Sequence, residues 1–300
     1  MYFVRLDQKD HIHTLMYENP KAKKVTDETL DILEKRMFGI HDISKEMDFC
    51  IENSETFSPV RLEKLVANNP TKLSSSPFIE VTSEKTQDAI YRLSKEGNTK
   101  LLALNFASPK NPGGGFVRGT VAQEEDICRA SALYPCLVAP QCETYYTRNV
   151  DYINMHSDLK PRPSPDGNLY TNWMIYSPQV PFFRTGDNQL TYDHVSLCSV
   201  ITSPAPHYRS VELGTPINTY AEVFSKRIEA ILALAESKRH DCLVLGAFGC
   251  GVFGNDPTFV ANLFKKHLES PRFSTSFAHV VFAVYDSKGV NTGIFKEILG

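Results

Sequence analysis

Short, almost continuously apolar runs alternate with amphipathic helical patterns in the last third of the chain, and this alternation restricts the folds it can adopt. The runs are VSLCSVIT (195–202), CLVLGAF (242–248) and HVVFAVY (279–285). Such runs are typical of strands buried on both faces of a sheet. Helices predicted to open at Thr215-Pro216 and Asp256-Pro257 lie between or after them, with a last one over 294–299. We predict a three-layer α/β fold with a mixed, partly parallel sheet.

The first part of the chain has a different character. Residues 1 to about 80 are polar and poor in glycine. Apolar residues at helical spacing predict one helix over 26–37 and a second that follows Ser83, a candidate N-cap, and ends at Gly97. We therefore predict an N-terminal helical extension over 1–97 that packs on a main domain over 98–300.

The main domain begins with a predicted buried strand over 100–106 and a helix over about 122–134. Thr120 and Gln123 have the spacing of a capping box at the start of that helix. The segment 135–192 is rich in Pro, Tyr, Asp and Asn and is predicted to be mostly loop. A long loop in a compact protein indicates a site or a partner surface.

Charge and composition exclude several classes of protein. The chain has 32 Lys and Arg against 35 Asp and Glu, a net charge of −3, which disfavours dedicated nucleic-acid binding. No apolar run approaches the ~18–20 residues of a membrane span, and the amino terminus does not resemble a signal peptide. We predict a cytoplasmic protein, or a nuclear one in a eukaryotic host. The seven cysteines form no CxxC pair and are predicted to be reduced thiols.

Two small clusters lie near the amino terminus. His11 and His13 form an HxH pair but have no partner at metal-ligand spacing, so we expect no metal. Lys21, Lys23 and Lys24 form a basic cluster, which is either a solvated face or a contact for an anionic polymer.

A glycine-rich loop and an acidic pair follow the strand predicted over 100–106. The loop is Asn111-Pro112-Gly113-Gly114-Gly115, and consecutive glycines suit a sharp turn or a main chain lying against a ligand. Glu124 and Glu125 come at the start of the next helix, near a strand end where α/β sheets bind ligands. Because neighbouring helical residues point about 100° apart, one carboxylate can bind hydroxyls while the other transfers protons.

A second glycine loop follows the strand predicted over 242–248. Gly249-x-Gly251-x-x-Gly254 matches the dinucleotide fingerprint between a strand and a helix, where backbone N–H groups can bind a diphosphate. The match lies too close to the carboxyl terminus for a complete nicotinamide-binding fold. A diphosphate site is therefore the better interpretation.

The run LNFASPKNPGGGFVRGTVAQEEDICRASALYP (104–135) carries GGG, seven further residues and then QEE. It resembles the signature of poly(ADP-ribose) glycohydrolases of the smaller microbial type, which are built on a macrodomain. The resemblance continues in SPQVPFFR (177–184), SVITSPAP (199–206) and LGAFGCGVFGNDP (245–257). It implies a macrodomain-like fold, with 98–300 as the catalytic domain. It also implies hydrolysis of ribose–ribose O-glycosidic bonds to release ADP-ribose, without a cofactor or metal.

The resemblance also implies roles for individual residues. Glu125 would be the acid/base on the glycosidic bond, and Glu124 would contact ribose hydroxyls. The remaining residues implied to bind substrate are Asn105, Asn111, Gly113, Gly114, Gly115 and Gln123, together with Gly249, Cys250, Gly251, Val252, Phe253 and Gly254 of the second loop.

Alternatives remain at this stage. The same pocket could belong to a mono-ADP-ribosyl hydrolase acting on modified protein or nucleic acid, or to a non-catalytic ADP-ribose binding module. The intact QEE disfavours the latter, and the position of the second loop disfavours a nicotinamide oxidoreductase. Trp173 is equally well explained as a core residue and as an adenine platform. The expected partner is ADP-ribose polymer or ADP-ribosylated protein, bound by a monomer without membrane or dedicated nucleic-acid contacts.

Overall fold

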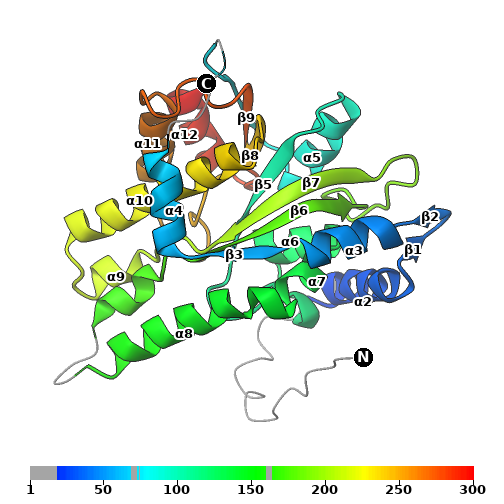
Figure 1. Cartoon of the computed structure of the whole chain (residues 1–300), viewed down its shortest axis with the longest axis horizontal. Coiled ribbons are helices and arrows are strands. Elements are labelled where there is room, and N and C mark those ends of the chain that lie inside the picture. The colour runs from blue at the N-terminus through cyan, green and yellow to red at the C-terminus, as the bar shows by residue number, and fades with distance from the viewer. Residues whose placement is uncertain (1–18, 69–72, 74, 160–163) are drawn as a thin grey trace.

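A mixed seven-stranded sheet crosses the centre of the structure, a computed structural model that describes residues 19–68, 73, 75–159 and 164–300 (Figure 1). Its order is β3-β6-β7-β5-β8-β9-β4. The strands are β3 (Glu55–Phe57), β4 (Phe78–Thr82), β5 (Leu101–Phe106), β6 (Met174–Phe182), β7 (Ser196–Ser203), β8 (Cys242–Leu245) and β9 (His279–Ala283). The five from β7 to β4 are parallel, whereas β6 is antiparallel to both neighbours. The predicted mixed, partly parallel sheet is confirmed.

Helices bury both faces of this sheet (Figure 1). On β5, Leu101 and Ala103 join one apolar cluster, while Leu102 and Leu104 join the other. The first cluster includes residues of α2 (Pro20–Lys35), α3 (Ser44–Glu52), α5 (Thr86–Lys95), α6 (Gln123–Ala130), α7 (Leu133–Leu137) and α8 (Glu143–Ser157). The second includes residues of α4 (Pro59–Ala67), α10 (Ile217–Ser237), α11 (Pro257–Leu268) and α12 (Val290–Leu299). The three-layer prediction is confirmed.

The helix starts agree with the sequence in one case and differ in two. Asp256 caps α11 by accepting the N–H of Phe259 at 2.8 Å, as predicted. Thr215 does not cap α10, because its hydroxyl donates to Asp166 instead. The last helix begins at Val290, four residues earlier than predicted, since the Asp286 carboxylate accepts three N–H groups of its first turn and that of Lys288 just before it.

The segment before residue 97 is not purely helical, and this corrects the prediction of a helical extension. This segment contributes both edge strands of the sheet, β3 and β4. The predicted boundary at residue 97 therefore does not separate the segment from the main sheet. Edge strands this short and half-exposed give little period-two signal. The helix starts shift as well. Asn19 caps α2 at Pro20, and α5 begins at Thr86 without a cap from Ser83.

The segment 135–192 is also more regular than predicted, because it contains α8 and β6. Two prolines, Pro178 and Pro181, suggest a loop there, since proline cannot donate a ladder hydrogen bond. The structure accommodates them because β3 pairs only with residues 174–176, and a bulge shifts the register between Ser177 and Val180. Trp173 packs against the first apolar cluster.

Smaller predictions have mixed outcomes. All seven cysteines are free thiols, six of them buried. Within the described residues, no helix is long and apolar enough to cross a membrane. His11 and His13 lie outside the described residues. Thr120 and Gln123 do not form a capping box, because α6 has Ala122 at its N-cap and no side-chain cap bond.

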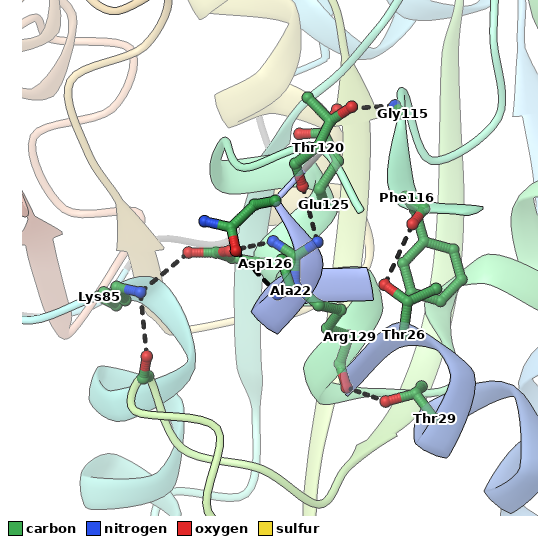
Figure 2. Close-up of polar contacts among 12 residues, drawn as sticks. Ala22, Thr26, Thr29, Lys85, Gly115, Phe116, Thr120, Glu125, Asp126 and Arg129 are labelled. Atoms are coloured by element: carbon green, nitrogen blue, oxygen red, sulfur yellow. Dashed lines mark hydrogen bonds and ion pairs between the residues drawn. The ribbon is translucent and has the colours of Figure 1, made fainter. Parts of the chain in front are cut away.

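Helix α2 supports the segment that contains both the glycine loop and the acidic pair (Figure 2). The hydroxyl of Thr26 donates to the carbonyl of Phe116 at 3.1 Å, and that of Thr29 donates to the carbonyl of Arg129 at 2.7 Å. Gly119 adopts a left-handed φ of +76°, and a Cβ there would lie 2.8 Å from the backbone nitrogen of Lys23. The first turn of α2 therefore lies directly against this segment.

Thr29→Val should lower the free energy of unfolding by about 1–3 kcal/mol, because it leaves the carbonyl of Arg129 without its buried donor. Thr219→Val makes the same change at an exposed position of α10 and should cost less than about 0.5 kcal/mol. Urea unfolding of both variants measures the difference. Equal stability of the two would show that the Thr29 bond contributes nothing.

Candidate active site

A cavity of about 790 Å³ opens at the carboxyl-terminal edge of the parallel strands. Residues that follow β5, β7, β8 and β9 line it, among them Ser108, Ala205, Gly249 and Tyr285. The first turns of α5, α6 and α12 also contribute to its wall. Open α/β sheets bind ligands at this edge. The volume suits a nucleotide-sized ligand.

Glu124 lies in the first turn of α6, and only 3% of its surface is exposed. The side-chain amide of Asn105 donates to Oε1 at 3.2 Å, and the backbone N–H of Ser108 donates to Oε2 at 2.7 Å. Both donors come from the end of β5 and the residues just beyond it. Each oxygen of this carboxylate is therefore fixed by the strand that leads into the cavity.

Glu125 faces the glycine loop instead. The backbone N–H of Gly115 donates to its Oε1 at 2.7 Å. Its Oε2 is buried and accepts no hydrogen bond from the described part of the chain. Glu125 is also one of the residues that line the cavity. The two neighbouring carboxylates thus have different surroundings.

Both carboxylates lie close to Gly114, and only glycine leaves room for them there. A Cβ at Gly114 would lie 2.4 Å from Oε1 of Glu125 and 3.0 Å from Oε2 of Glu124. The backbone φ of +60° is also left-handed, a conformation that glycine adopts without strain. The glycine loop therefore makes room for the acidic pair as well as lining the cavity.

The pair of carboxylates holds a proton at neutral pH. Burial raises the pKa of Glu124 from its ordinary value of 4.5 to about 8, and the negative charge of Glu125 adds to the rise. The N–H of Ser108 and the amide of Asn105 act in the opposite direction. A proton on Glu124 removes one of two adjacent negative charges.

A second polar network, around Asp126 and Arg129, connects α6 to neighbouring segments (Figure 2). Asp126 forms ion pairs with Arg129, which is buried, and with Lys85 at 3.0 Å. Arg129 also donates to the carbonyl of Thr120 at 2.7 Å, and Lys85 donates to the carbonyl of Gly186 at 3.0 Å. The acidic pair is therefore tied to the start of α5 and to the connection between β6 and β7.

The second glycine loop forms another part of the cavity wall. Gly249 has a left-handed φ of +74°, and a Cβ there would lie 2.6 Å from the Cβ of Ala205. The ring of Phe253 stacks on His207 with centroids 4.9 Å apart and also contacts Tyr170. Phe253 is thus held in position at the wall by aromatic neighbours from two other segments.

The catalytic-domain model of microbial-type PARG matches residues 26–185, more than half of the chain. The chain belongs to the microbial-type PARG family. PARG stands for poly(ADP-ribose) glycohydrolase, the enzyme named for the solved structures that it resembles. Among curated protein sequences, none matches the chain.

Solved PARG structures agree with this assignment. The PARG of Thermomonospora curvata is 32% identical and superposes with a TM-score of 0.84, over 94% of this chain and 100% of that one. The same enzyme bound to the inhibitor ADP-HPD gives 32% and 0.79, over 93% and 99%. The PARG of Deinococcus radiodurans in complex with ADP-ribose is 39% identical with a TM-score of 0.73, over 84% and 95%.

Most residues that the PARG resemblance marked as site residues line the cavity. These are Asn111, Gly114, Gly115, Gln123, Glu124, Glu125, Gly249, Gly251, Val252 and Phe253. Four do not line it directly: Asn105, Gly113, Cys250 and Gly254. Asn105 acts on the site through its bond to Glu124. A Cβ at Gly113 would lie 3.0 Å from the ring of Tyr134, so glycine is required there for packing.

Gln123, the first residue of QEE, has its side chain fully engaged within the protein. Its Oε1 accepts the N–H of Phe106 at 2.9 Å, and its Nε2 donates to the carbonyl of Leu104 at 2.9 Å and to Thr86 at 3.1 Å. It lines the cavity while binding the backbone of β5. In this structure its amide serves to hold α6 against the strand.

Several cavity residues were missed by sequence reasoning. They come from the start of α5, the end of β9 and the start of α12: Lys85, Thr86, Gln87, Tyr285, Asp286 and Asn291. Tyr285 and Asp286 follow a confirmed strand, as the glycine loops do, and this position was an available signal. The sequence held no such signal for Lys85 and Gln87, because they follow β4, a strand that was not predicted.

Gly114→Ala should destabilise the protein by about 2–4 kcal/mol, because the methyl group meets both carboxylates in a left-handed backbone conformation. Gly251→Ala is the matched control, since no atom lies within 4 Å of the added Cβ, and it should change stability by less than about 0.5 kcal/mol. Thermal unfolding distinguishes them. Equal melting temperatures would contradict the close approach at Gly114.

The raised pKa of Glu124 makes stability depend on pH. Folded Glu124 keeps a proton up to pH about 8 that the unfolded chain loses near 4.5, so its contribution is complete below 4.5 and is lost as pH rises to about 8. Glu124→Gln should remove a downward slope of at most about 1.4 kcal/mol per pH unit. Urea unfolding at pH 5, 6, 7 and 8 measures it. Exposed Glu34→Gln should keep the wild-type slope, and an unchanged slope in Glu124→Gln would contradict the assignment.

Proposed function

We propose that the chain is a poly(ADP-ribose) glycohydrolase that hydrolyses ribose–ribose O-glycosidic bonds and releases ADP-ribose. One observation carries the proposal: Glu125 lines a nucleotide-sized cavity, with one oxygen fixed by Gly115 and the other buried without a partner in the described part of the chain. Membership of the PARG family and the ADP-ribose bound in the Deinococcus radiodurans relative support the same substrate.

Glu125 is the proposed acid/base. It donates a proton to the bridging oxygen as the bond from that oxygen to the anomeric carbon breaks, through an oxocarbenium-like transition state. Water then adds to the anomeric carbon and returns its proton to the carboxylate. The hydrogen bond from Gly115 to Oε1 leaves Oε2 as the oxygen that carries the proton.

Glu124 is proposed to bind ribose hydroxyls and to keep the pair supplied with a proton. Its pKa of about 8 means that Glu124 holds a proton at neutral pH. That proton is available to the leaving oxygen through Glu125. The bonds from Asn105 and Ser108 prevent Glu124 from turning away from the cavity.

The glycine loops are proposed to bind the diphosphate and the terminal ribose. Backbone N–H groups of a glycine-rich loop approach phosphate oxygens without side-chain obstruction. Phe253, stacked on His207, offers an apolar surface to the ribose, and Tyr285 offers an exposed ring on which adenine can stack. This chemistry uses carboxylates and water, without a metal or cofactor.

The finer predictions from the sequence belong to this proposal. They are a macrodomain origin of the fold, a monomer without dedicated nucleic-acid contacts, and a cytoplasmic location. The substrate is proposed to be the polymer itself, with singly modified protein as the alternative. The experiment below separates these two substrates.

Glu125→Gln should lower turnover of auto-modified poly(ADP-ribose) about 10²–10⁴-fold, because the amide cannot donate an acidic proton. Affinity for ADP-ribose should change little, since Oε1 remains an acceptor for Gly115. Release of free ADP-ribose measures turnover, and titration calorimetry measures affinity. Exposed Glu297→Gln is the matched control and should behave as wild type.

Near-normal turnover by Glu125→Gln would refute its role as the acid. Release from singly modified protein but not from polymer would transfer the function to mono-ADP-ribosyl hydrolysis. Binding of ADP-ribose without release from either substrate would identify a binding module.

A further inference from the structure

Arg118 is a cation at the cavity wall that the proposed mechanism does not use. Among the described residues that line the cavity, the cations are Lys85 and Arg118. Lys85 is paired with Asp126, whereas the guanidinium of Arg118 is exposed and forms no ion pair or hydrogen bond within the described part of the chain. It therefore presents an unneutralised positive charge to whatever occupies the cavity mouth.

The backbone that carries Arg118 is fixed at the acid. Its N–H donates to the carbonyl of Gly115 at 3.0 Å, and the N–H of Gly115 donates to Glu125 at 2.7 Å. Thr120, two residues further on, bonds Arg129 of the acid's own helix. Arg118 consequently lies at the end of the cavity where the scissile bond has to sit.

The leaving group at the Arg118 end of the cavity depends on the substrate. In a polymer, the leaving group begins with the next ADP-ribose unit, whose diphosphate lies one nucleoside away from the broken bond and carries two negative charges. In singly modified protein, the leaving group is an amino-acid side chain without a phosphate. A guanidinium binds phosphate oxygens through two parallel N–H groups and so distinguishes these leaving groups.

Neighbouring charges favour the same ligand. The N–H of Asn19 donates to the carbonyl of Gly119 at 3.3 Å, which places the first turn of α2 beside Arg118. Lys21 and Lys24 are exposed on that helix and form no ion pair within the described residues. Two lysines of the basic cluster noted in the sequence are therefore unpaired on the helix beside Arg118, whereas the third, Lys23, pairs with Asp27.

We infer that Arg118 binds a phosphate of the ADP-ribose unit on the leaving side of the scissile bond. It thereby favours polymer over singly modified substrates. This inference rests on the proposed glycohydrolase function and adds a subsite to it.

The test compares polymer with free ADP-ribose, which fills the cavity but has no leaving unit. Arg118→Gln should raise KM for polymer roughly tenfold with kcat almost unchanged, because a charge-assisted phosphate contact is lost. The Ki of ADP-ribose as a competitor should stay the same. Arg118→Lys should restore most of the affinity for polymer, since the charge is kept. Lys266→Gln, at an exposed position of α11 outside the cavity wall, should leave KM unchanged.

Salt supplies a second readout. Wild-type KM for polymer should rise between 50 and 200 mM salt, and Arg118→Gln should show a smaller rise, because one screened charge contact is missing. An unchanged KM in Arg118→Gln would overturn the inference. An equal rise in KM and in the Ki of ADP-ribose would also overturn the inference, because it would show that Arg118 contacts the ADP-ribose unit inside the cavity and not the leaving unit. Failure of the wild type to release any ADP-ribose would instead refute the proposed function.

Discussion

Two carboxylates lie side by side in the protein interior, and the rest of the site is organised around keeping them there. Without compensation, burial and mutual repulsion would expel at least one of them to solvent. The structure gives Glu124 two donors from the end of β5 and gives Glu125 one donor from the glycine loop. A proton on Glu124 then reduces the charge of the pair. Burial therefore raises the pKa of Glu124 and also makes the hydrogen bonds that hold it necessary.

The acidic pair is also held by parts of the chain that are remote in sequence. Helix α2 donates hydrogen bonds to the carbonyl of Phe116, which follows the glycine loop, and to that of Arg129 in α6. Lys85, just before α5, forms an ion pair with Asp126 of α6. The segment before residue 97 also supplies both edges of the sheet. It is thus part of the scaffold that positions the acidic pair.

The sequence predicted the α/β class, the strands that carry the site and the two glycine loops, because buried strands and glycine turns have strong local signals. It did not predict β3, β4 or β6. The first two are short edge strands. Strand β6 contains Pro178, and a proline argues against a central strand because it cannot donate a ladder hydrogen bond. Asp286 was missed as a helix cap because its partners lie several residues away in an exposed turn. Such contacts depend on tertiary position, which local patterns do not contain.

The hydrogen bonds of Gln123 bear on which residues near the site can change without moving the acidic pair. Its amide exchanges hydrogen bonds with the backbone of β5 on both sides of Asn105, as a neighbouring strand would, and so fixes α6 in register with the sheet. Glu124 is positioned by the strand, whereas Glu125 is held by Gly115 of the glycine loop. Between the loop and α6, Arg118 and Val121 are exposed and can vary in charge and size, whereas Gly119 and Thr120 are fixed by contacts with Lys23 and Arg129. Under the proposed function, chemistry and recognition of the outgoing group are therefore separable, and Arg118 lies on the variable side of that division.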